Sequence, residues 1–266
     1  MNLRSFFRRR LPGGLILCFT LLASALASAA DSALDTVLDR GTLRVAMSGD
    51  QQPFNFAYGK DPSLIGFDMD LAAELARVMN VELKVVKTPF NDLIPALEDG
   101  RADVVISGMT MTAARTRDVS FVGPYVLSGK SMLLGKQAGS KLKTPGDFNQ
   151  AGLRLVALKG STSENIAQRR LPAVSLTLVE DYDAGIQSLL AGTADGMVAD
   201  LPILAYTKNR YPNADLQLVM PPLTVEPMGI ALAKGDPQFE NFLRNFMQVS
   251  ENTGVLQRLY KKWFEG

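Results

Sequence analysis

The chain repeats one short pattern, and this repetition limits most strongly what it can fold into. Gly100-Arg101-Ala102-Asp103 and Gly192-Thr193-Ala194-Asp195 each follow a helical stretch, turn, and lead into an apolar strand, at an offset of 92 residues. The preceding helices keep the same register, with aromatic Phe90 and Tyr182 at equivalent positions. A glycine that ends a helix before a strand is typical of αβ units. We therefore expect two similar α/β units, although turns of this kind also resemble one another by chance.

Hydrophobic periodicity predicts the same order of elements in both units. Apolar residues alternate in short strands and recur at helical spacing between them. For the first unit the order β-α-β-α-β is predicted over residues 43–47, 66–79, 81–86, 91–98 and 102–106. For the second unit it is predicted over residues 153–157, 163–170, 175–179, 183–191 and 196–199. Strands joined by crossover helices favour a parallel sheet in each unit.

The C-terminal residues are predicted to return to the first unit. A strand over 229–233, a helix over 237–251 and a last amphipathic helix follow the second unit. The chain would then cross between the units twice, near 126–131 and near 222–228. We expect an α/β protein of two Rossmann-like lobes. The predicted divisions are a signal peptide at 1–29, lobe 1 at 30–127 plus 226–266, and lobe 2 at 128–225.

The first 29 residues have the pattern of an export signal. Arg4 and the three arginines at 8–10 form a positive region, an apolar run follows, and Ala27-Ser28-Ala29 is a small-residue cleavage site. An N-terminal membrane anchor is the alternative, but the apolar run is short for a membrane span. We expect a mature periplasmic chain that starts near Ala30 or Asp31.

Composition excludes several kinds of chemistry in such a mature chain. The sequence has no histidine, and its one cysteine, Cys18, lies in the export signal. Zinc sites of the usual His/Cys kind and catalysis by Ser-His-Asp or Cys-His groups are therefore excluded. Loss of the four signal arginines lowers Lys+Arg from 28 to 24 against 27 acids, a net charge near −3, which argues against a nucleic-acid partner. We expect binding rather than catalysis, with no metal and no cofactor.

Polar residues follow the predicted strands at the edge where open parallel sheets bind ligands. These candidates are Asp50 and Gln51 after the first strand, Gly108 and Thr110 after the third, Ser161 and Thr162 after the strand at 153–157, and Asp200 after the strand at 196–199. The repeat places Gly108 and Asp200 at matching positions. We therefore expect the two lobes to present them from opposite walls of one cleft.

Arg115 and Asp200 are the charged candidates for a ligand that carries a carboxylate and an ammonium. The guanidinium of Arg115, five residues after Thr110, could hold a carboxylate through two parallel hydrogen bonds. A solvated arginine like Arg117 explains the position equally well. Asp200 could pair with an ammonium, but an Asp before Leu201-Pro202 also suits a helix N-cap. The residues alone leave both alternatives open.

Several short motifs also follow one another in the order of a known family. They are Gly41-Thr42-Leu43-Arg44-Val45, Pro53-Phe54, Gly66-Phe67-Asp68-Met69-Asp70-Leu71, Ser107-Gly108-Met109-Thr110-Met111-Thr112 with Arg115, and Phe121-Val122-Gly123-Pro124-Tyr125. This ordered set, which covers nearly all of the mature chain, resembles the periplasmic solute-binding proteins of ABC importers that carry polar amino acids. The resemblance implies the type II periplasmic binding protein fold, with two lobes joined by two hinge strands. It also implies a small ligand, an amino acid or related carboxylate, and a membrane permease as partner.

The resemblance further implies a role for each site residue. Arg115 would hold the ligand α-carboxylate with Thr110 and backbone N–H groups near Thr110 and Thr162, and Asp200 would take the α-ammonium with Thr110 and the Gly108 carbonyl. Phe90 would pack on the ligand side chain.

Two departures from the family pattern leave the ligand side-chain pocket unassigned. Gln51 stands where the family often has an aromatic residue. Ser48 stands where an acid is frequent, with Asp50 two residues on. Lys159 faces the same site by position and could meet an acidic or amide side chain, or it could be a solvated loop lysine.

Two other functions stay open on the sequence. Periplasmic cyclohexadienyl dehydratases resemble the same family, and residues 160–164 are close to their corresponding loop. Such an enzyme needs a general acid, for which Glu164 and Glu226 are candidates besides Asp50 and Asp200. A periplasmic accessory or sensor protein on the same fold is the third possibility.

Overall fold

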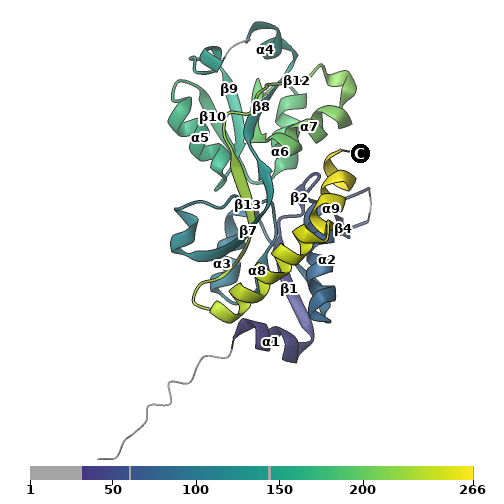
Figure 1. Cartoon of the computed structure of the whole chain (residues 1–266). Coiled ribbons are helices and arrows are strands. Elements are labelled where there is room, and N and C mark those ends of the chain that lie inside the picture. Colours follow the sequence, from purple (N-terminus) through teal and green to yellow (C-terminus); the bar gives the residue numbers. More distant parts are fainter. Residues whose placement is uncertain (1–31, 60, 143–144, 266) are drawn as a thin grey trace, which may run out of the picture. The chain divides into compact units, whose positions relative to one another are not determined.

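The computed structural model describes residues 32–59, 61–142 and 145–265, so the predicted signal peptide lies outside the described residues (Figure 1). Within them, no helix has the length and apolar character needed to cross a membrane.

The first sheet has five strands in the order β5-β1-β6-β13-β7. The strands are β1 (Thr42–Met47), β5 (Glu82–Lys87), β6 (Val104–Val105), β7 (Val119–Ser128) and β13 (Glu226–Ala233). β1 runs parallel to β5 and β6, as the crossover pattern predicts, and β13 is antiparallel to β6 and β7. The strand predicted over 102–106 is shorter than expected, because β6 keeps only two residues of ladder pairing.

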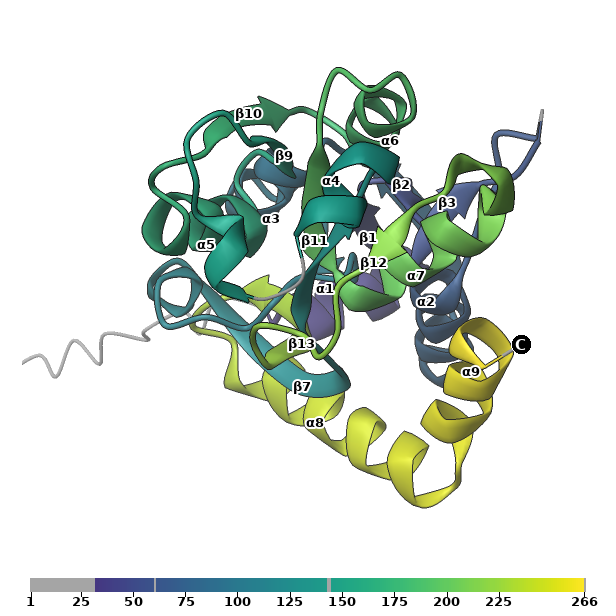
Figure 2. The same ribbon diagram turned by 90° about the horizontal axis from the view of Figure 1, so that it is seen from above.

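The helices that accompany this sheet come from both ends of the described chain. They are α1 (Ala33–Arg40), α2 (Phe67–Met79), α3 (Leu93–Glu98), α8 (Pro237–Asn252) and α9 (Val255–Phe264), with short 3-10 turns η1 (Phe90–Asp92) and η2 (Arg115–Arg117). The apolar stripe of α2 is buried, including Phe67, Leu71 and Leu75. Both views show α8 running beside β7 and α9 lying against α2 (Figures 1 and 2). The C-terminal helices thus return to the first sheet.

A small three-stranded sheet, β2-β3-β4, follows β1. Its strands are β2 (Asp50–Gln51), β3 (Asn55–Ala57) and β4 (Leu64–Ile65). Sequence periodicity did not predict it, because strands of two or three residues are too short to show alternation.

The second sheet has the order β10-β9-β11-β8-β12. Its strands are β8 (Lys130–Leu134), β9 (Arg154–Leu158), β10 (Ser175–Val179), β11 (Gly196–Asp200) and β12 (Gln217–Leu218). β9 is parallel to β10 and β11, whereas β8 is antiparallel to β11 and β12. Its helices are α4 (Lys136–Lys141), α5 (Thr162–Arg170), α6 (Tyr182–Leu190) and α7 (Leu201–Arg210), with 3-10 turns η3 (Pro145–Phe148) and η4 (Pro212–Ala214).

The repeated Gly-x-Ala-Asp turn has one structural role in both halves. Asp103 accepts hydrogen bonds from the backbone N–H (2.7 Å) and the guanidinium (Nη2, 2.7 Å) of Arg44 in β1. Asp195 accepts the same two kinds of bond from Arg154, 2.8 Å from the backbone N–H and 2.7 Å from Nη2. Each turn therefore stabilises the N-terminal end of the strand at the centre of the parallel part of its sheet, β1 in the first sheet and β9 in the second.

The chain changes sheet twice. β7 ends at Ser128 in the first sheet, and β8 starts at Lys130 in the second. After β12 the chain returns to the first sheet at Glu226, the first residue of β13 and the ladder partner of Ser128. The division into lobes at 127/128 and 225/226 stays a prediction.

Candidate functional site

Side chains from the two halves of the chain meet around Thr110 and Thr162. Their hydroxyl oxygens lie 3.4 Å apart, although the residues are separated by 52 positions. Thr110 forms an isolated bridge with Met228 of β13, and Thr162 is the first residue of α5. Thr110 and Thr162, whose surroundings the family resemblance implies as ligand contacts, therefore lie side by side.

Arg115 lies beside this pair in a fixed orientation. Its Nη1 donates to the Thr110 carbonyl (2.8 Å), its Nη2 donates to the Gly160 carbonyl (3.1 Å), and its Cζ lies 5.5 Å from the centroid of the Phe90 ring. Burial lowers the pKa of Arg115, opposed first by Asp200 among nearby acids. Arg117, in contrast, is exposed. A merely solvated arginine is therefore the wrong description of Arg115, whose remaining N–H donors are available to a ligand.

Phe90 lies beside the Arg115 guanidinium. Its ring is buried and faces this guanidinium. The family resemblance implies that it also packs on a ligand side chain. Contact with a ligand stays a prediction for this residue.

Asp200 is a buried acid with a partner that the sequence did not indicate. Its side chain does not cap α7, so the capping alternative is wrong. Instead, Oδ2 accepts from Nζ of Lys130 at 2.5 Å and Oδ1 accepts from the Ser128 hydroxyl at 3.2 Å. Burial raises the pKa of Asp200, and the Lys130 charge acts against this. A lysine at the start of the apolar stretch Ser131-Met132-Leu133-Leu134 was the available signal for a buried cation.

Glu226 adds a second buried carboxylate close to this ion pair. The residue is 7% exposed, and within the described residues its carboxylate has no hydrogen bond or ion pair. It is close enough that its charge acts on both Asp200 and Arg115. The sequence suggested Glu226 only as a general acid.

Tyr182 was not predicted as a site residue. It is buried at the start of α6, and burial raises the pKa of its hydroxyl well above 10, with Asp200 and Asp50 as nearby acids that add to the effect. Its register with Phe90 was the signal in the sequence that could have identified it.

Asp50 and Gln51 connect the small sheet to this region. Asp50 Oδ2 accepts from the backbone N–H of Tyr182 (2.8 Å), and Oδ1 is buried without a hydrogen-bond partner among the described residues. Burial raises the pKa of Asp50. The Gln51 amide nitrogen donates to the Ser48 hydroxyl (2.9 Å), and a Cβ added to Gly108 would lie 2.5 Å from Gln51 Oε1. Gln51 therefore packs directly over Gly108, which has a φ of +52°.

The remaining predicted groups are bonded within the chain. The Ser161 hydroxyl caps α5 by accepting from the Glu164 N–H (3.3 Å) and donates to the Leu158 carbonyl (2.6 Å). Lys159 is exposed and pairs with Glu180 at 2.8 Å, so the solvated-lysine alternative describes it better. The Glu164 carboxylate accepts from the Gly160 N–H at 2.7 Å.

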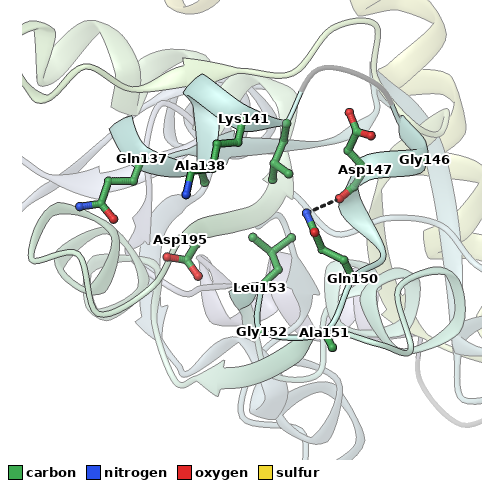
Figure 3. A pocket seen from close by; sticks show the side chains of 11 residues that line it. Gln137, Ala138, Lys141, Gly146, Asp147, Gln150, Ala151, Gly152, Leu153 and Asp195 are labelled. Atoms are coloured by element: carbon green, nitrogen blue, oxygen red, sulfur yellow. Dashed lines mark hydrogen bonds between the residues drawn. The ribbon is translucent and has the colours of Figure 1, made fainter.

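A separate surface pocket of about 600 Å³ lies on α4 and the loop before β9 (Figure 3). Lys141, Gln150 and Asp195 are among its lining residues, and the Gln150 amide donates to the Asp147 carbonyl at 2.8 Å. None of the predicted site residues lines it. The described residues also contain no group of three or more Asp, Glu, His or Cys side chains arranged to hold a metal ion.

Comparison with known proteins matches the chain over almost all of its described length. Residues 43–266 match the bacterial extracellular solute-binding proteins, family 3. The cyclohexadienyl dehydratase of Pseudomonas aeruginosa is 28% identical over 254 residues, which are 94% of this chain and 92% of that protein.

Two solved structures extend the likeness to the fold. An ancestral amino acid-binding protein, described as a precursor of cyclohexadienyl dehydratase, is 37% identical with a TM-score of 0.81, covering 88% of this chain and 99% of that one. A putative binding component of an ABC transporter from Wolinella succinogenes, complexed with lysine, is 36% identical with a TM-score of 0.80, covering 85% and 96%. The fold is thus the type II periplasmic binding protein fold, with two Rossmann-like lobes.

Proposed function

Because the chain belongs to the bacterial extracellular solute-binding proteins of family 3, we propose that it captures an amino acid between its lobes and delivers it to an ABC importer. We further propose that residues 1–29 are a signal peptide cleaved on export to the periplasm. Similar proteins of known structure include an ancestral amino acid-binding protein and a putative ABC transporter binding component in complex with lysine. The importer permease is the partner that the family implies.

The orientation of Arg115 is the observation that carries this proposal. A guanidinium presents parallel donors that match a carboxylate, and its side chain loses little freedom on binding when contacts already fix it. Phe90 and the Thr110 carbonyl provide those contacts. A ligand carboxylate would replace the Gly160 carbonyl on Nη2 and add bonds from the Thr110 and Thr162 hydroxyls.

Bonds between the halves support capture by closure. Asp50 bonds the N-terminus of α6, and Arg210 of α7 donates to the Gln52 side chain at 2.7 Å. Hinge closure around a ligand is an established mode of domain motion. These bonds would form as the lobes close and would hold the ligand away from water.

The experiment is a thermal-shift screen of the purified chain against the amino acids and small organic acids. A ligand raises the melting temperature by mass action. Arg115→Ala should abolish the shift and weaken binding by roughly a hundredfold or more, since it removes charge-assisted hydrogen bonds to the carboxylate. Arg117→Ala is the matched control, because that exposed arginine should not affect binding. Normal ligand binding by Arg115→Ala would show that Arg115 does not hold the ligand carboxylate.

A second candidate is a cyclohexadienyl dehydratase-like enzyme. It is favoured by the similarity to the Pseudomonas aeruginosa enzyme and by the Glu226 carboxylate, which is unpaired among the described residues. The Glu226 carboxyl group could act as the general acid for a leaving hydroxyl. The test is incubation with prephenate. Its conversion to phenylpyruvate, with loss of carbon dioxide and water, would establish the enzyme. Absence of turnover together with binding of an amino acid would establish the binding protein.

A further inference from the structure

We propose that Glu226 accepts the ligand's α-ammonium, in the role that the family resemblance assigns to Asp200. This inference rests on the proposed function, because it assumes an amino acid whose carboxylate binds Arg115. It concerns the part of the site where buried charges are already paired within the chain.

Asp200 is already neutralised by the protein. Both of its oxygens accept hydrogen bonds, from Lys130 and Ser128, and the Lys130 and Asp200 side chains are only 2% and 4% exposed. A ligand ammonium at Asp200 would have to compete with the buried ammonium of Lys130, which has no other hydrogen-bond or ion-pair partner among the described residues. Separating a buried ion pair leaves an uncompensated charge and is strongly unfavourable. Asp200 is therefore a poor acceptor as long as Lys130 stays in place.

Glu226 has the opposite properties. The residue is buried, its carboxylate has no hydrogen bond or ion pair within the described residues, and its charge acts on Arg115 and Asp200. The Glu226 oxygens are not among the fully buried side-chain oxygens that lack a partner in the described residues, so they keep some access to solvent. A cation that reaches them would meet an unpaired negative charge in largely buried surroundings. A ligand ammonium would supply the missing donors.

The strand ladder fixes the position of Glu226. As the first residue of β13, it pairs with Ser128 of β7, and the Ser128 hydroxyl donates to Asp200. Both strands join the two sheets at this point, so Glu226 does not depend on a loop for its placement. Arg115 and Glu226 thus offer a guanidinium and a carboxylate to the two ends of an amino acid head group.

The test measures affinity by titration calorimetry for Glu226→Gln, with L-arginine, L-lysine, L-glutamine and L-histidine as probes. Each probe that binds the wild-type chain is paired with its analogue lacking the α-amino group. Loss of a charge-assisted bond to the ammonium should weaken the amino acid roughly ten- to hundredfold and leave the deamino analogue within about threefold. Glu180→Gln, which removes a surface glutamate, is the matched control.

Glu226→Asp is a second variant for cases in which the wild-type chain binds the analogue too weakly to measure. It keeps the charge and should bind the amino acid at least about threefold more tightly than Glu226→Gln. Equal affinity of the two variants would overturn the inference.

The other outcomes separate this inference from the proposed function. If no amino acid binds the wild-type chain, the proposed function fails and the inference falls with it. If the wild type binds but Glu226→Gln binds equally well, or loses both probes equally, only the inference is overturned. A Glu226→Gln chain that does not fold would also overturn it, because Glu226 would then be a structural group.

Discussion

Asp68 and Asp200 are both buried aspartates, one in each half of the chain, and they are stabilised in different ways. Asp68 is 0% exposed and accepts from the Asn55 amide at 2.7 Å, without an ion pair among the described residues. Burial raises its pKa to about 7. Asp200 is 3% exposed and has an ion pair with Lys130. The raised pKa favours the protonated, uncharged form of Asp68, whereas the charge of Asp200 is balanced by the Lys130 ammonium.

The two acids also have different neighbours among the charged residues of the candidate site. Asp68, at the start of α2, belongs to a polar cluster with Asn55 and Ser107 that is bonded within itself. Asp200, at the end of β11, shares its surroundings with Arg115 and Glu226. Charged groups from both halves therefore gather around Asp200, where a ligand would bind.

The largest expected effect comes from removing the cation of the Asp200 pair. Lys130→Met leaves a buried carboxylate without its partner, and we expect a loss of about 3–5 kcal/mol in the free energy of unfolding. Urea denaturation of the unliganded chain measures it. Lys136→Met, which breaks an exposed pair with Asp215, should cost less than about 1 kcal/mol.

Replacing both members of the pair completes this test. Lys130→Met with Asp200→Leu should recover most of the lost stability, because apolar side chains of similar size replace a buried ion pair at little cost. A Lys130→Met chain as stable as the wild type would show that the buried Asp200 carboxylate does not need Lys130 for its stability.

Asp68 should instead give the chain a pH-dependent stability. A folded pKa of about 7, against 3.8 when unfolded, means that the folded state holds a proton that the unfolded state releases. The resulting stabilisation is complete below about pH 4 and is lost as the pH rises to about 7. Asp68→Asn should remove this loss and gain up to about 4 kcal/mol over the wild type above pH 7.

The measurement is the free energy of unfolding between pH 4 and 8 for both chains. Asp99→Asn, at an exposed surface pair with Arg101, serves as the control. Parallel curves for Asp68→Asn and wild type would mean that Asp68 is not protonated in the folded chain at neutral pH.

A smaller difference is expected between the two repeated turns. Asp103 has a side chain 5% exposed and binds both Arg40 and Arg44, whereas that of Asp195 is 21% exposed and pairs with Arg154. Asp103→Ala should cost about 2–3 kcal/mol and Asp195→Ala about 1 kcal/mol, since burial strengthens charge-assisted bonds. Equal losses by urea denaturation would mean that the backbone bonds, which both turns share, decide the stability.

Much of the fold could be predicted from the chain because its signals are local. Alternating strands, amphipathic helices and the glycine-ended turns at Asp103 and Asp195 depend on neighbours within a few residues. The order β-α-β in each half and the return of the C-terminal helices agree with the structure. The three-stranded sheet and the shortening of β6 could not be predicted, because ladder pairing depends on strands distant in sequence.

The candidate site, too, could be predicted only in part from the sequence. The absence of histidine and the positions of Arg115, Thr110 and Asp200 after predicted strands were set by the sequence itself. Only the tertiary structure decided that Lys130, 70 positions from Asp200, neutralises it. Only the tertiary structure also decided that the Glu226 carboxylate has no partner among the described residues. Pairing of buried charges depends on which strand ends lie next to each other in the fold. A local sequence pattern cannot predict this, because the strands are far apart in the sequence. The sequence thus determined which charged groups lie at the strand ends, and the fold determined which of them stay free for a ligand.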